Sequence, residues 1–255
     1  MERDFIYGDR FASTFNEPVI YCETHKANEL LSNPPKYDFV LVTHNSDGKI
    51  LDFTKETRWD SADFNKIPTN LVKWFGQNVG VKNDKIFSIP IGLENPKWFV
   101  NDKKIQNIEM FSKTENKYKN LLYLNFDVST NPKERTEPIN LFSNKKWVKI
   151  TNGKNGKNFL EYIMDIKTHK FVLCPEGNGI DTHRTWETLY LGSIPIEKRN
   201  VNNSFYSDLP ICFVDSWDEI TEEFLYFEYE RIKKTKWNMD KLKFSYWKEL
   251  ILNSI

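Results

Sequence analysis

The sequence predicts an α/β protein built from two Rossmann-like domains that face a cleft, with a helical tail at the carboxyl end. Short apolar runs of strand length alternate with longer stretches of helical character. This alternation stops at a polar, charged stretch, Asn101–Asn120, and then starts again. We therefore expect an N-terminal domain over residues 1–104 and a second domain, carrying the tail, over residues 105–255.

The first unit contains three expected strands and two expected helices. Strands are expected at Pro18–Cys22, Tyr37–His44 and Lys85–Gly92, and helices at His25–Leu31 and Asn70–Asn78. The continuous apolar middle of Tyr37–His44 is typical of a strand buried in a parallel sheet.

The second unit repeats this alternation and ends in helices. The expected strands are Asn120–Phe126, Lys145–Thr151, Lys170–Pro175, Ser193–Ile196 and Leu209–Val214. The expected helices are Gly156–His169, Thr182–Gly192, Glu219–Ile232 and Met239–Ile251.

Composition excludes several classes of protein. Lys+Arg and Asp+Glu are both 36, and this neutral balance argues against a dedicated nucleic-acid binder. An apolar run long enough for a membrane span is missing, and the N-terminus lacks the apolar core of a signal peptide, so we expect a cytoplasmic protein. Cys22, Cys174 and Cys212 lie in apolar runs and are expected to be reduced and buried.

The most specified stretch of the chain is CPEGNGIDTHRTWETLYLGSIP, Cys174–Pro195. Pro175 ends a strand, and the glycines of Glu176–Gly179 permit a close backbone approach. Asp181 or Thr182 suits a helix N-cap, and Gly192 suits the residue after the helix. The stretch therefore predicts a strand, a glycine-containing turn and a short helix whose exposed amides form an anion site.

Arg184 and Glu187 lie within this helix, three residues apart. The Arg184 guanidinium could bind phosphate oxygens in a forked geometry, and the Glu187 carboxylate could accept the hydroxyls of a ribose. A ligand with both features is a nucleoside diphosphate. A capped helix with a surface Arg–Glu pair is the alternative. The run matches neither G-x-G-x-x-G nor a P-loop, which disfavours a generic dinucleotide or ATP site.

The segment FVLCPEGNGIDTHRTWETLYLGSIPI resembles the donor-binding segment of exostosin-like glycosyltransferases, of the small soluble kind found in bacteria and large DNA viruses. The resemblance is strongest over Phe171–Ile196 and implies a two-domain GT-B fold. It assigns the diphosphate to Arg184 and the ribose to Glu187, while Gly192 and the following Ile-Pro match the structural end of the motif.

Further donor contacts are expected around this helix. The polar loop in Leu124–Ile139 would face the diphosphate, with Arg135 as a second phosphate candidate; a solvated helix start is the alternative. The expected donor-binding residues are Arg135, Glu176, Gly177, Asn178, Gly179, Asp181, Thr182, His183, Arg184 and Glu187. Asp181 and His183 could instead only cap the helix or line the loop.

The catalytic base is expected in the first domain, which holds the acceptor in such enzymes. Asp47 is the first candidate and His44 the second, because both follow the buried strand and either side chain could deprotonate a hydroxyl. A simple N-S-D-G turn is an equally good interpretation. Glu23 and His25 are candidate acceptor contacts, and Glu94 is a weaker candidate at the crossover between the domains.

The function expected from this reasoning is transfer of a sugar from a nucleotide-diphosphate donor to a glycan hydroxyl. The resemblance favours a UDP-sugar and inversion of configuration. We expect no obligatory metal, because a D-x-D motif has no convincing instance at a strand end, and no other cofactor. Alternatives are a fucosyltransferase that uses GDP-fucose, a non-catalytic nucleotide- or glycan-binding domain, and an enzyme that binds ATP or NAD at the same anion site.

Overall fold

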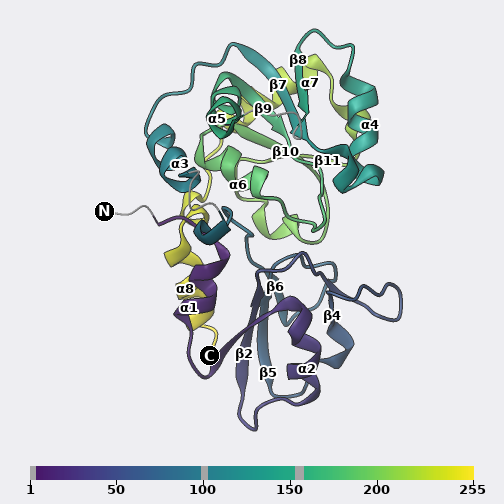
Figure 1. Ribbon diagram of the computed structural model, residues 1–255, viewed down its shortest axis with the longest axis vertical. Helices are drawn as coiled ribbons and strands as arrows, with labels where there is room; N and C mark the ends of the chain where they lie inside the picture. Colours follow the sequence, from purple (N-terminus) through teal and green to yellow (C-terminus); the bar gives the residue numbers. More distant parts are fainter. Residues whose placement is uncertain (1–3, 99–102, 153–157) are drawn as a thin grey trace.

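The computed structural model describes residues 4–98, 103–152 and 158–255 and shows an α/β fold with parallel sheets. One sheet has the strand order β1-β2-β5-β6 and a second has the order β11-β10-β9-β7-β8. Within both sheets the paired strands run parallel. The first sheet forms the lower half of the molecule in Figure 1 and the second the upper half.

The first sheet consists of β1 (Val19–Glu23), β2 (Phe39–His44), β5 (Leu71–Gly76) and β6 (Ile86–Ser88). The three strands expected in this half of the chain are confirmed as β1, β2 and β6. The helix α2 (Ala27–Ser32) occupies most of the first expected helix. Every residue of β2 is buried because β2 is central in the sheet and both faces are covered: Val40 and Val42 pack in one apolar cluster, and Phe39 and Leu41 in another.

The helix expected at Asn70–Asn78 is wrong, because this segment contains β5. Leu71, Trp74 and Phe75 have helical spacing, yet all three are buried in a strand that pairs with β2 and β6. The run is short and rich in aromatic residues, and periodicity does not separate helix from strand over such a length. Tertiary pairing decides the outcome, with the Trp74 indole Nε1 donating to Thr43 Oγ1 at 2.9 Å.

Three further elements of the first half have no counterpart in the prediction. These are α1 (Gly8–Thr14) and the short parallel strands β3 (Ile50–Leu51) and β4 (Ala62–Asp63).

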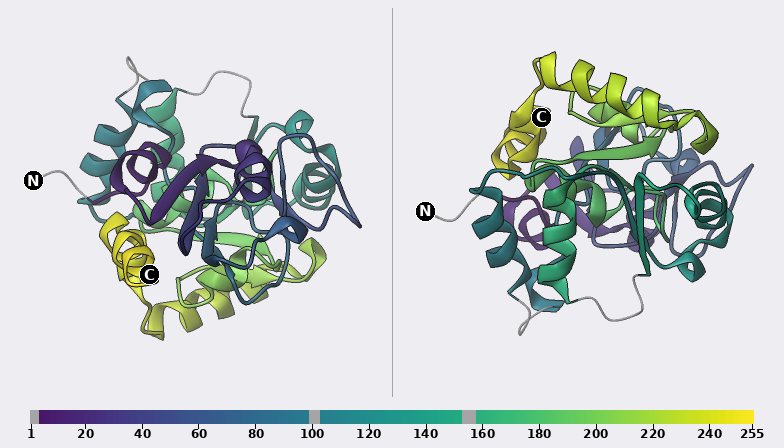
Figure 2. Two further views of the ribbon diagram at one scale, coloured as in Figure 1. Left: turned by 90° about the horizontal axis from the view of Figure 1, so that it is seen from below. Right: turned by 90° about the horizontal axis from the view of Figure 1, so that it is seen from above.

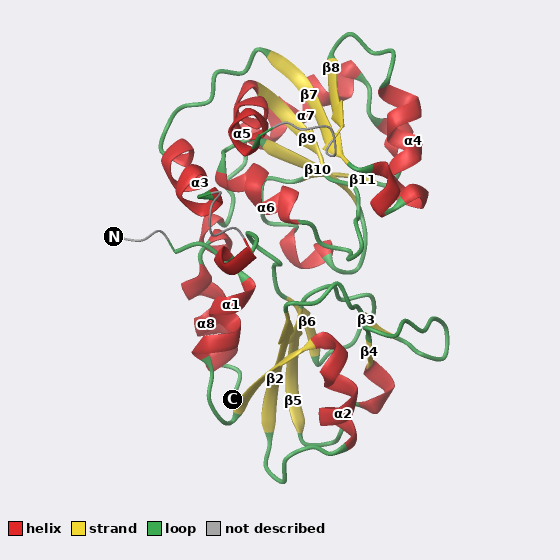
Figure 3. Ribbon diagram, in the orientation of Figure 1, coloured by secondary structure: helices red, strands yellow, loops and turns green. Residues whose placement is uncertain are grey.

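The second sheet contains all the strands expected after the charged stretch. They are β7 (Asn120–Phe126), β8 (Val148–Asn152), β9 (His169–Leu173), β10 (Ile194–Lys198) and β11 (Cys212–Val214). The accompanying helices are α3 (Lys104–Ser112), α4 (Pro132–Phe142), α5 (Phe159–Thr168) and α6 (His183–Tyr190). Figure 3 shows these helices around the strands. Residues 101–102 of the charged stretch and 156–157 of the expected Gly156–His169 helix lie outside the described residues.

The tail is helical, as expected, and it returns to the first half of the chain. Its helices are α7 (Glu222–Lys234) and α8 (Phe244–Leu252). Figures 1 and 2 show α8 beside α1, where the rings of Phe11 and Phe244 meet at 5.0 Å. One apolar cluster includes Phe11, Val42, Trp186 and Trp247, so the tail, the first sheet and α6 share a core.

Short 3-10 helices complete the chain: Thr24–Lys26, Phe64–Lys66, Pro96–Trp98, Val128–Thr130, Asn203–Tyr206, Trp217–Glu219 and Met239–Leu242. In the part of the chain that the structure describes, no helix is long and apolar enough to cross a membrane. Cys174 and Cys212 are buried and Cys22 is half-buried, and all three are free thiols.

Candidate functional site

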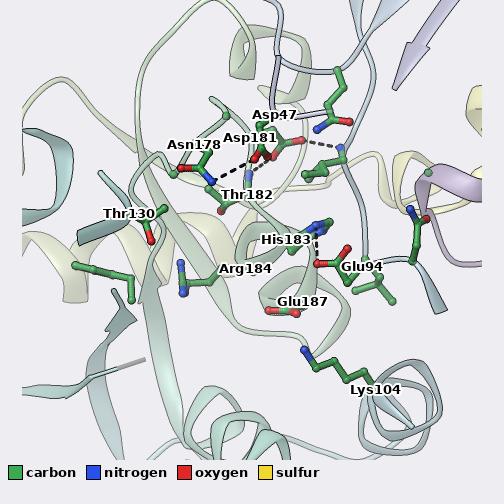
Figure 4. Close-up of a pocket in the computed structure, with 18 of the residues that line it drawn as sticks. Asp47, Glu94, Lys104, Thr130, Asn178, Asp181, Thr182, His183, Arg184 and Glu187 are labelled. Atoms are coloured by element: carbon green, nitrogen blue, oxygen red, sulfur yellow. Dashed lines mark hydrogen bonds and ion pairs between the residues drawn. The ribbon is translucent and has the colours of Figure 1, made fainter. Parts of the chain in front are cut away.

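A cavity of about 1220 Å³ lies at the carboxyl ends of strands from both sheets. His44 and Asp47 enter it from the end of β2, Gln77 from beyond β5 and Phe126 from the end of β7. The glycine-containing loop before α6 forms another wall, and Figure 4 shows side chains from these segments converging. Parallel sheets place ligand sites at this end of their strands.

Most of the predicted site residues line this cavity. They are Glu23, His44, Asp47, Arg135, Gly177, Asn178, Gly179, Asp181, Thr182, His183, Arg184 and Glu187. Glu176 and His25, both described, lie outside its lining.

The two glycines of the loop are required by close contacts within the protein. A Cβ atom on Gly177 would lie 2.9 Å from Arg135 Nη2, and one on Gly179 would lie 2.6 Å from Asn78 Nδ2. Real Cβ atoms essentially never approach other atoms this closely. The loop therefore reaches the Arg135 guanidinium on one side and the first sheet on the other, and larger residues at these positions would push it away from both.

The Asp181 carboxylate accepts hydrogen bonds from the protein and holds the glycine-containing loop in place. Its oxygens accept hydrogen bonds from the backbone N–H groups of Ile91 at 2.8 Å and Thr182 at 2.8 Å, and from Trp186 Nε1 at 2.9 Å. Burial raises the Asp181 pKa to about 6, although these hydrogen bonds act in the opposite direction. These contacts favour the alternative in which Asp181 holds the loop, and a role for Asp181 in donor binding stays a prediction (Figure 4).

The guanidinium groups of Arg184 and Arg135 both lie near the Phe126 ring, at 5.8 Å and 5.6 Å from its centroid. Arg135 is buried, and it donates from Nε to the Glu176 carbonyl and from Nη1 to the Asp127 carbonyl, both at 2.9 Å. Burial and the charge of Arg184 lower the Arg135 pKa to about 10. Within the described residues neither guanidinium is paired with a carboxylate, so two cations share one wall of the cavity. Such a wall attracts an anion.

Glu187 is buried on the next turn of α6, and Tyr162 of α5 holds it in place. The Tyr162 hydroxyl donates to Glu187 Oε2 at 2.7 Å, while Oε1 has no hydrogen-bond donor among the described residues. Burial and the Glu187 charge raise the Tyr162 pKa well above its usual value, so the phenol stays protonated. The alternative of a surface Arg184–Glu187 pair is wrong for the described structure, because the two side chains are presented separately to the cavity.

His44 does not have a free nitrogen with which to act as a base, which corrects the second candidate. Nε2 lies 3.0 Å from the Pro90 carbonyl, and Nδ1 accepts the Asn45 backbone N–H at 2.7 Å. The ring is buried and stacks on Phe11, and burial lowers its pKa to about 4. A neutral imidazole with both nitrogens engaged supports the loop after β2.

Asp47 lies exposed at the rim of the cavity. Its Oδ2 accepts a hydrogen bond from Asn178 Nδ2 at 3.2 Å, and Arg58 Nη1 donates to the Asn178 carbonyl at 2.6 Å. These contacts connect the first half of the chain to the glycine-containing loop. A role for Asp47 as a base stays a prediction.

The two expected acceptor contacts interact mainly with neighbours. Glu23 pairs with Lys26 at 2.7 Å and lies 3.6 Å from His25 Nε2, so it lines the cavity with its charge partly compensated.

Glu176, an expected donor contact, directs its carboxylate to Asn200 Nδ2, at 3.3 Å, and burial raises the pKa of this carboxylate. Its backbone carbonyl, and not its side chain, contributes to the site by accepting from Arg135.

Two residues of interest were missed or underrated by sequence reasoning. Tyr162 had no local signal, because its partner Glu187 is remote in sequence. Glu94, rated weakly, approaches His183: Glu94 Oε2 and His183 Nε2 are 3.4 Å apart, and His183 Nδ1 lies 2.8 Å from the Gly92 carbonyl.

Comparison with known proteins gives no family for this chain. No family model matches the sequence, and no curated protein matches it.

Proposed function

We propose that this protein is a glycosyltransferase of the exostosin-like GT-B kind, which transfers a sugar from a nucleoside-diphosphate donor to a glycan hydroxyl. One observation carries the proposal. Arg184 and Arg135, without carboxylate partners among the described residues, share a cavity with the separately presented Glu187 carboxylate. This set of groups matches a ligand with two phosphates and a diol.

The dimensions of the cavity agree with a nucleotide sugar together with part of an acceptor. Pockets for drug-sized ligands have volumes of roughly 300–1,000 Å³, and this cavity, at about 1220 Å³, is larger. Its walls come from both sheets, as in an enzyme that binds donor and acceptor on opposite domains and closes over them.

The site supports departure of the diphosphate. As the bond between the sugar and the diphosphate breaks, negative charge grows on the phosphate oxygens, and fixed guanidinium groups stabilise that charge more than they stabilise the ground state. The backbone contacts of Arg135 hold its guanidinium in place before the donor binds. The Glu187 carboxylate, oriented by Tyr162, would accept the ribose hydroxyls. A UDP-sugar is the first donor class to test and a GDP-sugar the second, on the resemblance alone.

The deciding experiment is thermal unfolding with UDP, GDP, CMP, ADP and NAD for the wild type, Arg184→Ala and a matched control, Arg199→Ala. Arg199 is exposed at the end of β10 and pairs with Asp215. A ligand at about 100 Kd stabilises the folded state by roughly 2.7 kcal/mol. Each lost hydrogen bond between arginine and phosphate weakens binding by about 1.5–3 kcal/mol, or roughly 10- to 100-fold.

We expect UDP or GDP to stabilise the wild type and Arg199→Ala, and the effect to shrink sharply in Arg184→Ala. A folded wild type that responds to no nucleotide would refute the donor site. An equal response in Arg184→Ala would refute the role of Arg184, and a preference for ADP or NAD would favour the alternative nucleotide enzyme. Release of nucleotide from the matching nucleotide sugar then separates a transferase from a non-catalytic binding domain.

A further inference from the structure

The crossover segment between the two sheets carries a carboxylate into the cavity. Glu94 follows Gly92 and Leu93 in this segment, and its side chain is about one-third exposed. Figure 4 shows the Glu94 carboxylate between His183 and Glu187, on the side of Arg184 away from Thr130.

The backbone on the N-terminal side of Glu94 is fixed by the protein. The Ile91 N–H donates to Asp181 Oδ2 at 2.8 Å, and the Leu93 N–H donates to the Ile6 carbonyl at 2.7 Å. Gly92 between them has a φ of +68°, and a Cβ there would lie 2.2 Å from the Ile6 carbonyl oxygen. The turn therefore requires glycine and allows little movement at Glu94.

The side chain that follows Glu94 is fixed as well. Asn95 Oδ1 accepts the Asp9 backbone N–H at 2.8 Å, and Asn95 Nδ2 donates to Asn45 Oδ1 at 2.9 Å. Contacts on both sides thus hold the Glu94 backbone before any ligand binds, which is what a catalytic group needs.

His183 completes the arrangement from the first turn of α6. Its Nδ1 lies 2.8 Å from the Gly92 carbonyl, which accepts only a protonated nitrogen, so Nδ1 carries a hydrogen. Its Nε2 lies 3.4 Å from Glu94 Oε2, and His183 can hold the carboxylate when this nitrogen carries a hydrogen too, so that one ring nitrogen donates to the Gly92 carbonyl and the other to Glu94. His183 directly precedes Arg184 at the start of α6, so one helix turn carries both the imidazole beside Glu94 and the proposed phosphate-binding cation.

The other carboxylates that line the cavity are less suited to take a proton from a hydroxyl. Asp181 accepts hydrogen bonds from three groups of the protein, and Asp127 Oδ1 accepts two from Ser129. Glu23 is paired with Lys26, and Glu187, held by Tyr162, is the group proposed above to bind the ribose. Asp47 is exposed at the rim, where solvent competes with a substrate hydroxyl.

We propose that Glu94 is the catalytic base of this site and that His183 is the residue that positions it. The inference depends on the proposed transferase function. The acceptor hydroxyl gives its proton to the Glu94 carboxylate while its oxygen forms a bond to the anomeric carbon of the donor sugar. The bond from that carbon to the phosphate oxygen breaks, and its electron pair leaves with the diphosphate beside Arg184. When water is the acceptor, the same step releases the free sugar and the nucleoside diphosphate.

The test uses this reaction with water, because the natural acceptor is unidentified. Purified wild type, Glu94→Gln, Glu94→Asp, His183→Asn and Asp47→Asn are incubated with UDP-glucose, UDP-galactose, UDP-N-acetylglucosamine and GDP-fucose, and released UDP or GDP is measured. Donor binding is followed by thermal shift with UDP and GDP. Glu29→Gln, an exposed glutamate of α2, is the matched control.

We expect Glu94→Gln to bind nucleotide as the wild type does and to lose about 10²- to 10⁴-fold in kcat. Glu94→Asp should recover part of this loss. His183→Asn keeps a donor for the Gly92 carbonyl and removes Nε2, so it should lower kcat and leave KM nearly unchanged.

Three results would overturn the inference. The first is a wild-type kcat in Glu94→Gln. The second is loss of turnover in Asp47→Asn with turnover retained in Glu94→Gln. The third is a wild type that binds UDP or GDP but releases nucleotide from none of the donors. Failure of every nucleotide to bind would instead refute the proposed function itself.

Discussion

The pKa of Glu197 predicts how the stability of the protein depends on pH. It lies on β10, where its carboxylate accepts hydrogen bonds from Thr185 Oγ1 and from Asn203 Nδ2, the latter at 3.1 Å. Burial, with the negative charge of Asp181 acting in the same direction, raises the Glu197 pKa from 4.5 to about 8. The folded protein therefore favours the protonated acid at neutral pH.

The sign of the effect follows from proton counting. Between pH 4.5 and about 8 the folded state holds a proton on Glu197 that the unfolded state has lost. Stability therefore falls as the pH rises through this range, by up to about 1.4 kcal/mol per pH unit. The upper limit over the whole range is about 5 kcal/mol. Because Glu197 keeps some solvent exposure, we expect about 1–2 kcal/mol between pH 6 and 8.

Urea unfolding at pH 6, 7 and 8 measures this loss for the wild type, Glu197→Gln and the exposed control Glu137→Gln. The window begins at the Asp181 pKa of about 6, and the lowered His44 pKa makes stability rise slightly with pH near pH 6, so the difference between the wild type and Glu197→Gln isolates Glu197. The wild type and the control should lose stability as the pH rises, and Glu197→Gln should lose much less, since an amide carries no charge. An unchanged slope in Glu197→Gln would refute the reasoning.

Two further predictions concern the loop and α6. Gly179→Ala should destabilise the protein by about 1–3 kcal/mol in urea unfolding, because its Cβ would lie 2.6 Å from the amide of Asn78, a fully buried residue; unchanged stability would show that Asn78 can move. Tyr162→Phe should weaken UDP binding by about 1 kcal/mol, or roughly fivefold, by releasing Glu187. In calorimetric titrations 2′,3′-dideoxy-UDP should show no such loss, and an equal loss for both ligands would contradict contact between Glu187 and the ribose.

Much of the fold could be predicted because its signals are local. The continuous apolar run that becomes β2 predicts a buried strand, and Gly192 marks the end of α6 with a φ of +80°. Asn70–Asn78 could not be assigned in this way, because its apolar spacing fits a helix and only the pairing of β5 with β2 and β6 makes it a strand. The element α1 was missed because its short sequence is stabilised by contact with α8 from the other end of the chain.

In the candidate site, too, some residues could be placed from local sequence and others only from tertiary contacts. Local spacing was enough to place Arg184 and Glu187 on one short helix that opens toward the carboxyl ends of the strands. The same reasoning could not separate His44 from Glu94, because both follow strand-like runs. The difference is tertiary, since the backbone engages both nitrogens of His44.

The sequence by itself determined an alternating α/β chain, the strand, loop and helix around Arg184, and a neutral charge balance that disfavours nucleic acid as a ligand. These properties depend on residue type and on neighbours within a few positions. Only the tertiary structure decided which polar groups remain available to a ligand, because that depends on contacts between residues far apart in sequence. Asp181 is bound to Ile91, Glu187 to Tyr162, and Arg135 to the Glu176 carbonyl. Burial and hydrogen bonding, which chain folding creates, separate a structural carboxylate from one that can bind a ligand.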